Sequence, residues 1–297
     1  MPLFKYLTSE NLNRVLDGSI RFTQPGAFND PFEMVPELHV PEGFKEKDIS
    51  INFDVLAPRR TPSVGELDID FESDHCNDIN SRKILASLNK SVGILCLSKN
   101  ESSLLMWSHY AGEYSGAIIE LDEEHEFFEG LFDIDYREHR PKKDISSYLS
   151  GDSPIPIAEL CVKPKVWEYE SESRIVRNLS DCKAVGKFNG YSVYVMDFPL
   201  SAIKSITLGE RMSIDTQREI WNKVKDTNIS LYLAAISNWG YEFRKEQIKY
   251  DKPVSACSPI VSPRTAHIFS NLTGEFGDIA RWMIQNHKLS EIANDTL

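Results

Sequence analysis

Apolar, strand-like runs constrain the fold of this chain more than any other feature of its sequence. Segments with helical periodicity separate these runs, and the two kinds of segment neither alternate strictly nor form separate blocks. This order predicts an α+β protein with a mixed, mostly antiparallel central sheet, flanking helices and further helices at the C-terminal end. The runs lie at 20–23, 92–98, 117–121, 192–198, 201–209 and 229–236.

The expected helices carry recognisable end signals. Thr8 is placed to cap the first helix and Gly18 to end it. Asn100 or Ser102 is placed to cap a short helix that carries several aromatic residues. The helices are expected over 8–17, 80–90, 104–110 and 213–226. The last of these lies between two strand-like runs, which predicts a βαβ unit.

The distribution of turn-forming and charged residues predicts the domain organisation. We expect a single α+β domain over 1–250 with a variable insertion at 36–80, followed over 251–297 by an extended linker and a C-terminal helix. An acidic stretch at 66–78 lies in the insertion. Its lack of Lys and Arg favours a solvated loop or short edge strand over a divalent-metal site.

The composition of the chain indicates its cellular compartment and the classes of partner that it can bind. Its 297 residues, 41% of them apolar, can bury a large core, while the net charge of −12 gives no general attraction to nucleic acid phosphate. No apolar run approaches the ~20 residues of a membrane span, and the start lacks the pattern of a secretory signal. The five cysteines form no CxxC pair. We therefore expect a cytoplasmic protein with no structural zinc and no membrane partner.

The common phosphate-binding, zinc-protease and hydrolase motifs do not occur in the sequence, since it contains no GxxxxGK[ST], GxGxxG, HExxH or GxSxG. The spacing allows a nucleophile pair of Cys96 and His109. The strand around Cys96 is apolar, however, which favours a buried and inert thiol.

Three short blocks carry polar and aromatic residues at unusual density, and they span 4–33, 95–122 and 166–176. If the third block is a strand, alternation places Glu168, Glu170, Glu172 and Arg174 on one face. Adjacent carboxylates repel each other unless a cation or a ligand lies among them. The row is therefore either a solvent-facing edge that Arg174 neutralises or a set of catalytic carboxylates in a groove.

The second block places Trp107, His109 and Tyr110 just before a strand. Each of these residues, taken alone, is more often a packing group. Together they favour one wall of a small-molecule site, because flat rings with polar heads suit stacking on a ligand ring and bonding a ribose or an amide. In the first block, Asn29 and Asp30 form a turn and either bond local backbone or belong to that site.

Together the blocks resemble an uncharacterised bacterial family, domain of unknown function 2971. Its members carry Lys-Tyr near the start, a Phe-Asn-Asp-Pro-Phe turn, Met-Trp-x-His-Tyr-Ala before a Gly, Trp-x-x-Glu-x-Glu-x-Arg, and a later Ile-x-Leu-Gly strand. The resemblance covers about residues 4–210, and the family name implies no function. The motifs stand here at Lys5–Tyr6, Phe28–Phe32, Met106–Ala111 with Gly116, Trp167–Arg174 and 205–212.

The order of elements is also similar to that of ADP-ribosyltransferases of the toxin type, which end their site with a carboxylate on a strand. Glu170-Ser171-Glu172 matches the Glu-x-Glu form of that carboxylate. Two departures are that Lys5-Tyr6 stands where His or Arg is usual and that no Ser-Thr-Ser follows. This likeness implies an enzyme that uses NAD, either a transferase or an NAD glycohydrolase, with a role as a toxin or in phage defence.

The chemistry of that class assigns roles to the residues of the blocks. Glu172 would stabilise the oxocarbenium-like state beside the nicotinamide ribose, and Glu170 would orient the nucleophile of a protein or nucleic acid acceptor. Tyr110 or Trp107 would stack on the nicotinamide ring, and His109 would bond the ribose. Lys5 or Arg174 would bind the pyrophosphate. Tyr6, Asn29 and Asp30 would complete the nucleotide site.

Two other functions are compatible with the same residues. One is a nuclease or phosphodiesterase that holds Mg²⁺ or Mn²⁺ with Glu170, Glu172, Asp135 and His109, although the sequence contains no D…ExK arrangement. The other is a module without catalysis, in which the aromatic block recognises a nucleotide or a partner and the carboxylates are structural.

Overall fold

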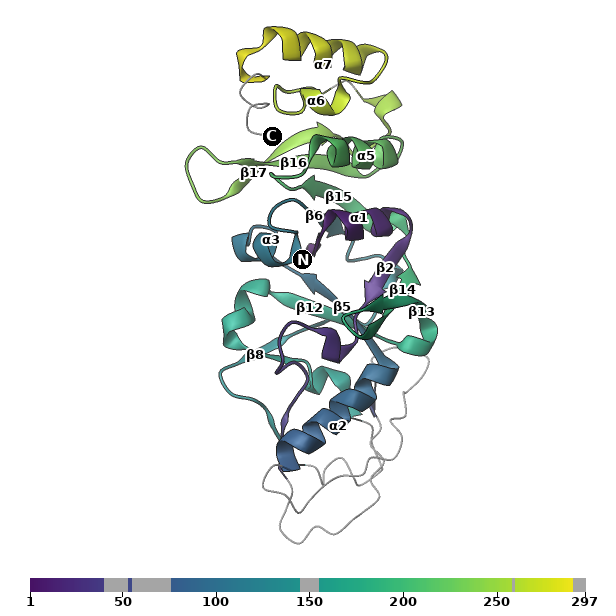
Figure 1. The fold of residues 1–297 in the computed structure, drawn as a ribbon, viewed down its shortest axis with the longest axis vertical. Coiled ribbons are helices and arrows are strands. Elements are labelled where there is room, and N and C mark those ends of the chain that lie inside the picture. Colours follow the sequence, from purple (N-terminus) through teal and green to yellow (C-terminus); the bar gives the residue numbers. More distant parts are fainter. Residues whose placement is uncertain (40–52, 55–75, 145–154, 258–259, 291–297) are drawn as a thin grey trace. The chain divides into compact units, whose positions relative to one another are not determined.

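The computed structural model describes residues 1–39, 53–54, 76–144, 155–257 and 260–290 (Figure 1). These residues form two compact units, each built from segments that are distant in sequence. Unit 1 comprises Met1–Gly18, Ser98–His125 and Phe198–Leu297, and unit 2 comprises Ser19–Leu97 and Glu126–Asp197. Most of the acidic stretch at 66–78 lies outside the described residues. The described residues after 250 belong to unit 1, and the expected division at residue 250 stays a prediction.

Unit 1 is built on a mixed, mostly antiparallel sheet, as the sequence predicts. Its strands lie in the order β17-β16-β15-β6-β1, and every neighbouring pair is antiparallel except β15 and β16. Strand β5 (Val92–Ser98) lies mostly in unit 2, but its last residue, Ser98, belongs to unit 1 and pairs with Phe4 of β1. The strands are β1 (Leu3–Leu7), β6 (Ala117–Leu121), β15 (Ile203–Leu208), β16 (Ser230–Ile236) and β17 (Phe243–Lys249).

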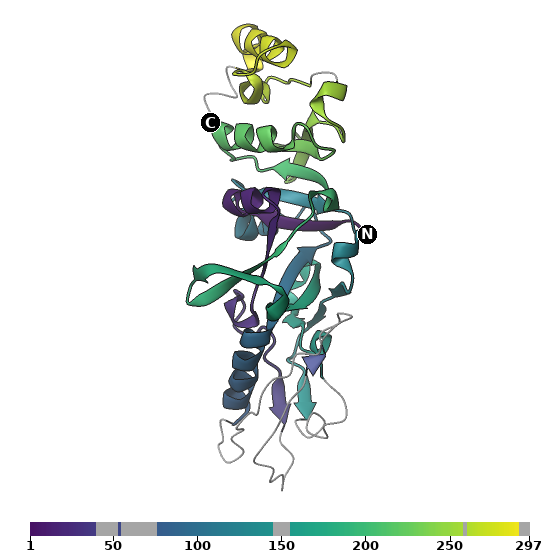
Figure 2. The same cartoon turned by 90° about the vertical axis from the view of Figure 1, so that its right-hand side faces the viewer.

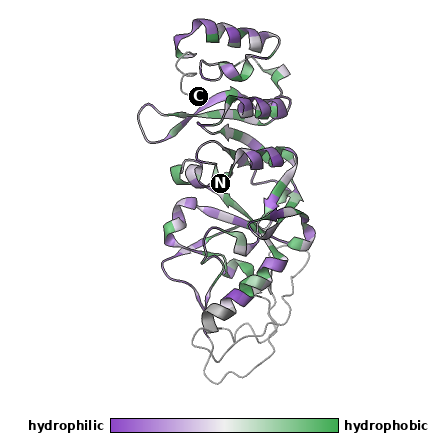
Figure 3. Ribbon diagram, in the orientation of Figure 1, coloured by the Kyte–Doolittle hydropathy of each residue, from purple (hydrophilic) through white to green (hydrophobic). Residues whose placement is uncertain are grey.

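Most of the helix ends predicted from capping residues are confirmed in unit 1. The Thr8 side chain accepts the Asn11 N–H at the start of α1, and Ser213 caps α5 in the same way. Because β15, α5 and the parallel strand β16 follow one another, the predicted βαβ unit is confirmed. Figure 3 shows α5 alternating between hydrophilic and hydrophobic residues, as a helix with one buried face does. The helices are α1 (Ser9–Leu16), α3 (Leu104–Tyr110), α5 (Ile214–Val224), α6 (Ala266–Phe269) and α7 (Glu275–Asn286).

The predicted cap of α3 was wrong by one to three residues. Ser103 caps the helix, and its Oγ accepts the N–H of Met106. Asn100 instead caps the turn before the helix, where its Oδ1 accepts the N–H of Ser102 at 2.9 Å. Ser and Asn cap equally well, so three such residues within four positions, Asn100, Ser102 and Ser103, leave the start of the helix undetermined by composition.

Unit 2 contains the strands β5 (Val92–Ser98), β12 (Glu172–Asn178) and β7 (Phe132–Asp133) in that order, and a separate sheet of β13 (Lys183–Phe188), β14 (Tyr191–Asp197) and β2 (Ser19–Phe22). The β13–β14 hairpin is visible at the left of Figure 2. The apolar core lies between α2 (Cys76–Ser91) and the strand β5. Short parallel pairs join β3 (Glu37–His39) to β9 (Lys142–Asp144), β4 (Phe53–Asp54) to β10 (Ile155–Pro156) and β8 (Asp135–Arg137) to β11 (Val162–Pro164).

The prediction of a strand through the whole third block was wrong. Residues 165–170 form a 3₁₀ helix, and Ser171 adopts a left-handed conformation with φ of 44°. The strand β12 begins only at Glu172. Glu168 is exposed while Glu170 and Glu172 are buried, so the carboxylates do not share one strand face.

Within the described ranges, none of the helices has the length and apolar character needed to cross a membrane.

Candidate functional site

The aromatic block of unit 1 is both a packed corner and the wall of a pocket. Trp107 of α3 is almost completely buried and packs edge-on against Tyr6, with ring centroids 5.8 Å apart, and against Phe243, at 5.9 Å. The Tyr6 hydroxyl donates to the Asn100 carbonyl at 2.8 Å. These contacts fix the indole, and its remaining surface lines a cavity of about 120 Å³.

This cavity, which we call the sheet-face pocket, lies where α3 covers one face of the unit 1 sheet. Figure 1 shows α3 on one side of β1 and β6 and α1 on the other. Because side chains alternate along a strand, neighbouring strands place polar groups side by side on this face. The lining residues are Phe4, Glu101, Ser102, Trp107, Ile118, Glu120, Ser205, Thr207, Ala234, Phe243 and Lys245.

Two carboxylates and one cation set the charge of the sheet-face pocket. Glu120 stands opposite Ser205 in the β6–β15 ladder, and the Ser205 Oγ donates to Glu120 Oε2 at 2.7 Å. Lys245 forms an ion pair with Glu101 and lies over the ring of Tyr232. Since the ammonium of Lys245 offsets one carboxylate, the pocket keeps a formal charge of −1 at Glu120.

Two glycines hold the pocket wall against the sheet. Gly116 donates its N–H to the Ala111 carbonyl, and its carbonyl accepts the N–H of Gly209 at 2.7 Å. A Cβ at Gly116 would lie 2.1 Å from the Leu7 carbonyl oxygen, so no larger residue fits there. Gly116 of the second block and Gly209 of the Ile-x-Leu-Gly motif therefore contact each other through their backbones.

The other residues predicted in unit 1 do not line this pocket. His109 is exposed, and its ring contacts that of Tyr110 at 6.2 Å. Lys5 is adjacent in β1 to Phe4 and Tyr6, so it faces the opposite side of the sheet. Of the predicted unit 1 residues, Trp107 lines the pocket and Tyr6 supports it, whereas the roles of His109, Tyr110 and Lys5 stay predictions.

Unit 2 brings the first and third blocks together in a buried ion cluster. We use this name for Glu33, Lys163, Glu170, Glu172 and Arg174, all of which are at most 5% exposed. Lys163 Nζ donates to Glu170 at 2.5 Å and to Glu172 at 2.7 Å, and lies 3.7 Å from Glu33. Arg174 holds Glu172 through Nε at 2.7 Å and Nη2 at 3.2 Å, and its Nη1 forms an ion pair with Glu33 at 2.7 Å.

Aromatic residues from the same blocks enclose the ion cluster. Phe28 lies over the Arg174 guanidinium at 5.0 Å, and Trp167 lies over the Lys163 ammonium at 5.6 Å. The Tyr136 hydroxyl accepts the backbone N–H of Glu172. The two motif blocks are thus distant parts of one cluster, held by charge pairs and by cation–π contacts.

Asn29 and Asp30 lie in the turn between Phe28 and Glu33. Asp30 is buried, and its Oδ1 accepts the N–H of Phe32 at 2.9 Å, which is the local backbone role weighed above. Asn29 is exposed. Neither residue lines the sheet-face pocket, and their role in a nucleotide site stays a prediction.

Burial and charge pull the pKa values of the ion cluster in opposite directions. Burial alone would raise the pKa of Glu172, but the charges of Arg174 and Lys163 outweigh it and hold the pKa at about 2. For Glu33 burial prevails over the same two cations, so its pKa is raised. Glu172 is therefore a fixed anion, whereas Glu33 resists ionisation more strongly.

We predict that Glu172 stabilises the fold in a pH-dependent way. Its pKa falls from an ordinary 4.5 to about 2 on folding. This contribution is therefore fully present above the unfolded value and is lost as the pH falls through the folded value. Glu172→Gln should lower the free energy of unfolding by about 3 kcal/mol at pH 7 and by less than half of that at pH 3. Urea denaturation at both pH values measures this; a loss that is equal at pH 7 and pH 3 would contradict it.

The residues predicted for a metal site have other partners. Asp135 forms an ion pair with Arg137 at 2.6 Å, Glu170 and Glu172 are held by Lys163, and His109 belongs to unit 1. In the part of the chain that the structure describes, no three His, Cys, Asp or Glu side chains are arranged to hold a metal ion.

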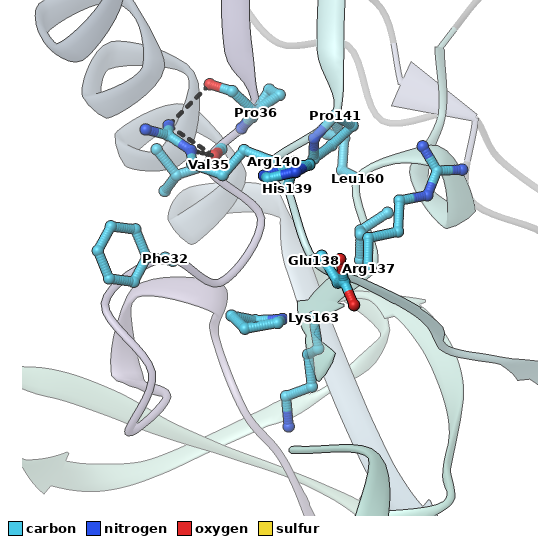
Figure 4. Close-up of a pocket in the computed structure, with 12 residues that line it drawn as sticks. Phe32, Val35, Pro36, Arg137, Glu138, His139, Arg140, Pro141, Leu160 and Lys163 are labelled. Carbon is cyan, nitrogen blue, oxygen red and sulfur yellow. Dashed lines mark hydrogen bonds between the residues drawn. The ribbon is translucent and has the colours of Figure 1, made fainter. Parts of the chain in front are cut away.

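A second cavity, of about 200 Å³, lies in unit 2 beside the ion cluster (Figure 4). Arg140 on its wall donates to the Val35 and Pro36 carbonyls, and Arg137 pairs with Asp135. In Figure 4 the Lys163 amine points away from Arg140. Because Arg137, Arg140 and Lys163 already have partners, these three cations do not form an open anion site.

Sequence reasoning missed several residues of both clusters. In unit 1 a signal was available, because Glu120 is the polar residue inside the apolar run 117–121, and Ser205 and Thr207 interrupt another run. In unit 2, Glu33 is the last residue of the first block, whereas the sequence around Lys163 contains no motif that would identify it as a site residue. The missed residues are Glu101, Glu120, Ser205, Thr207 and Lys245 in the pocket, and Glu33 and Lys163 in the ion cluster.

No protein-family model, curated protein or solved structure matches this chain. The resemblance between its blocks and domain of unknown function 2971 therefore stays a prediction.

Proposed function

We propose that this chain cleaves the nicotinamide–ribose bond of NAD in the sheet-face pocket of unit 1, as an ADP-ribosyltransferase or an NAD glycohydrolase. The observation that carries the proposal is the Glu120 carboxylate, which Ser205 orients among hydroxyl groups and aromatic rings in a cavity. Carboxylate, hydroxyl and flat ring are the groups that a positively charged ring on a ribose requires.

The reaction assigns a role to each of these groups. As the C1′–N bond breaks, its electron pair moves to the nicotinamide nitrogen and positive charge develops on the ribose. The Glu120 carboxylate would stabilise that charge, while Trp107 and Phe243 would contact the ring and Thr207 the ribose. Water, or a nucleophile of a protein or nucleic acid acceptor, then bonds C1′ and releases a proton.

The geometry favours Glu120 over Glu172 as the carboxylate of the reaction. Both oxygens of Glu172 already accept hydrogen bonds from Arg174 and Lys163, and the side chain is 5% exposed. An anion that two cations neutralise has little charge left to stabilise a transition state. We therefore move the role first predicted for Glu172 to Glu120 and assign the ion cluster to the stability of unit 2.

The experiment that tests the proposal is NAD turnover by the purified protein, with and without bacterial cell extract as a source of acceptor. Mass spectrometry measures free nicotinamide and ADP-ribosylated products. We expect nicotinamide release, and we expect Glu120→Gln to reduce it about 100-fold, because the amide keeps the size and the Ser205 contact but loses the charge. Wild-type protein that releases no nicotinamide under either condition would refute the proposal.

Two further variants identify the carboxylate. Glu219 is an exposed residue of α5 in the same unit, so Glu219→Gln removes one negative charge outside the pocket and should leave turnover unchanged. Glu172→Gln tests the original assignment. If folded Glu172→Gln protein loses turnover and Glu120→Gln protein does not, the reaction belongs to the ion cluster and not to the sheet-face pocket.

The second candidate function is nucleotide binding without turnover. It is favoured by the ion pair between Glu101 and Lys245, because two of the charged side chains in the pocket are already paired with each other. In that case NAD would bind and be recovered intact, and Glu120→Gln would alter affinity alone. A toxin or phage-defence role in the cytoplasm belongs to the enzymatic proposal, because depletion of NAD or modification of an acceptor is its only consequence in a cell.

A further inference from the structure

The hairpin that joins β16 to β17 exposes two large aromatic side chains at its tip. Trp239 is 95% and Tyr241 99% exposed, and Gly240 separates them. The tip is closed by the hydrogen bond from the Ser237 N–H to the Glu242 carbonyl at 3.1 Å. Such a pair contributes nothing to the core, and its exposure costs free energy of hydration unless a ligand or partner covers it.

The same hairpin supplies part of the sheet-face pocket. Phe243, which follows the tip directly, packs on Trp107, and Lys245 lies two residues further along β17. A strand rises about 3.3 Å per residue, so the backbone of Tyr241 lies within about 7 Å of that of Phe243. The exposed rings and the pocket are therefore neighbouring parts of one element.

The pocket is too small for a whole dinucleotide. Its volume is about 120 Å³, whereas pockets that enclose a ligand of drug size measure about 300–1,000 Å³. If the nicotinamide ribose fills the pocket, the adenosine half of NAD must extend beyond it. The tip residues present flat, uncharged faces in that neighbourhood, and neither Trp239 nor Tyr241 has a charged residue next to it except Glu242.

We propose that Trp239 and Tyr241 form a stacking subsite for the adenine ring of a dinucleotide whose nicotinamide ribose occupies the sheet-face pocket. This inference rests on the proposed function. Adenine is flat and neutral, and bases stack on aromatic side chains without needing a charged partner. The subsite would explain both the exposure of the two rings and the small volume of the pocket.

A membrane surface is the other setting in which exposed Trp and Tyr are common. The observations favour the nucleotide, because the pocket residue Phe243 follows Tyr241 by two positions and because the net charge of −12 opposes approach to anionic lipid. Sedimentation with vesicles of phosphatidylcholine and phosphatidylserine tests this alternative. If wild-type protein binds the vesicles and Trp239→Ala protein does not, the proposal is overturned.

Steady-state kinetics with two substrates tests the subsite. Nicotinamide mononucleotide contains the reacting bond but lacks the adenosine half. Trp239→Ala and Tyr241→Ala should each raise KM for NAD about tenfold and leave kcat/KM for the mononucleotide unchanged. Trp239→Phe should retain most of the affinity, since it keeps an aromatic face. Equal losses for NAD and for the mononucleotide, or no loss for NAD, would overturn the inference.

A binding measurement separates this inference from the proposed function. Ligand-detected NMR of AMP reports adenine binding whether or not NAD is cleaved. Weaker AMP binding in Trp239→Ala protein than in wild type would support the subsite even if the wild type releases no nicotinamide. AMP affinity that is the same in wild type, Trp239→Ala and Tyr241→Ala would refute the subsite even if NAD is cleaved.

Discussion

Replacing Arg174 by Met should lower the free energy of unfolding by about 3–5 kcal/mol. Arg174 is fully buried and holds two carboxylates, those of Glu172 and Glu33. Met fills a similar volume but leaves these carboxylates with Lys163 as the remaining cation of the cluster. The unpaired buried charge, more than the lost attraction, is the source of the cost. Urea denaturation at pH 7 measures the change.

Two variants provide comparison. Arg137→Met breaks the Arg137–Asp135 pair, which is about half exposed, and should cost less than about 1 kcal/mol. Arg174→Lys keeps the positive charge and should fall between the two, so it gives a measurable value if Arg174→Met protein does not fold. Equal destabilisation by Arg174→Met and Arg137→Met would show that burial gives this cluster no special weight.

Gly209→Ala should destabilise the protein by about 3 kcal/mol, at the upper end of the cost of overpacking. A Cβ at Gly209 would lie 2.1 Å from the Tyr114 carbonyl oxygen and 2.7 Å from that of Gly116. Both atoms are backbone, so relief requires a shift of the α3–β6 connection and breaks the Gly209–Gly116 hydrogen bond. Thermal unfolding measures the loss.

Gly186→Ala is the matched control, because a Cβ at Gly186 meets no atom within 4 Å. We expect its effect to be below about 1 kcal/mol. Since Thr207 precedes Gly209 by two residues and lines the sheet-face pocket, Gly209→Ala should also weaken ligand binding there. An unfolding midpoint unchanged from wild type would mean that the backbone at Gly209 yields more easily than the contact distances indicate.

The parts of the fold that follow a simple period could be predicted from the sequence. The runs 92–98 and 229–236 became strands because their apolar residues have no other way to be buried, and the cap predicted for α5 at Ser213 is confirmed. The same reasoning gave a wrong prediction for the third block, residues 166–176. Its alternation is that of a strand, but Ser171 adopts a left-handed conformation that no periodicity reveals.

The candidate sites were less predictable because they depend on contacts between distant segments. Trp107 was identified from the density of aromatic residues around it, and it does line a pocket. Glu170, Glu172 and Arg174 were identified as a group, but their burial depends on Lys163 and Glu33, which come from other elements. The pairing of buried charged side chains depends on tertiary structure, so the residue pattern of a single strand does not predict it.

The interleaving of the two units has a consequence for how the chain acquires its structure during synthesis. Strand β1 lies between partners that follow it by about a hundred residues or more, and β6 pairs in turn with β15, which is made still later. All segments of unit 2 have emerged before Phe198. Strands β5 and β6, which pair with β1, have also been made by then, whereas β15, β16 and β17 follow Asp197. The late, non-local step of folding is therefore the completion of the unit 1 sheet by these three strands.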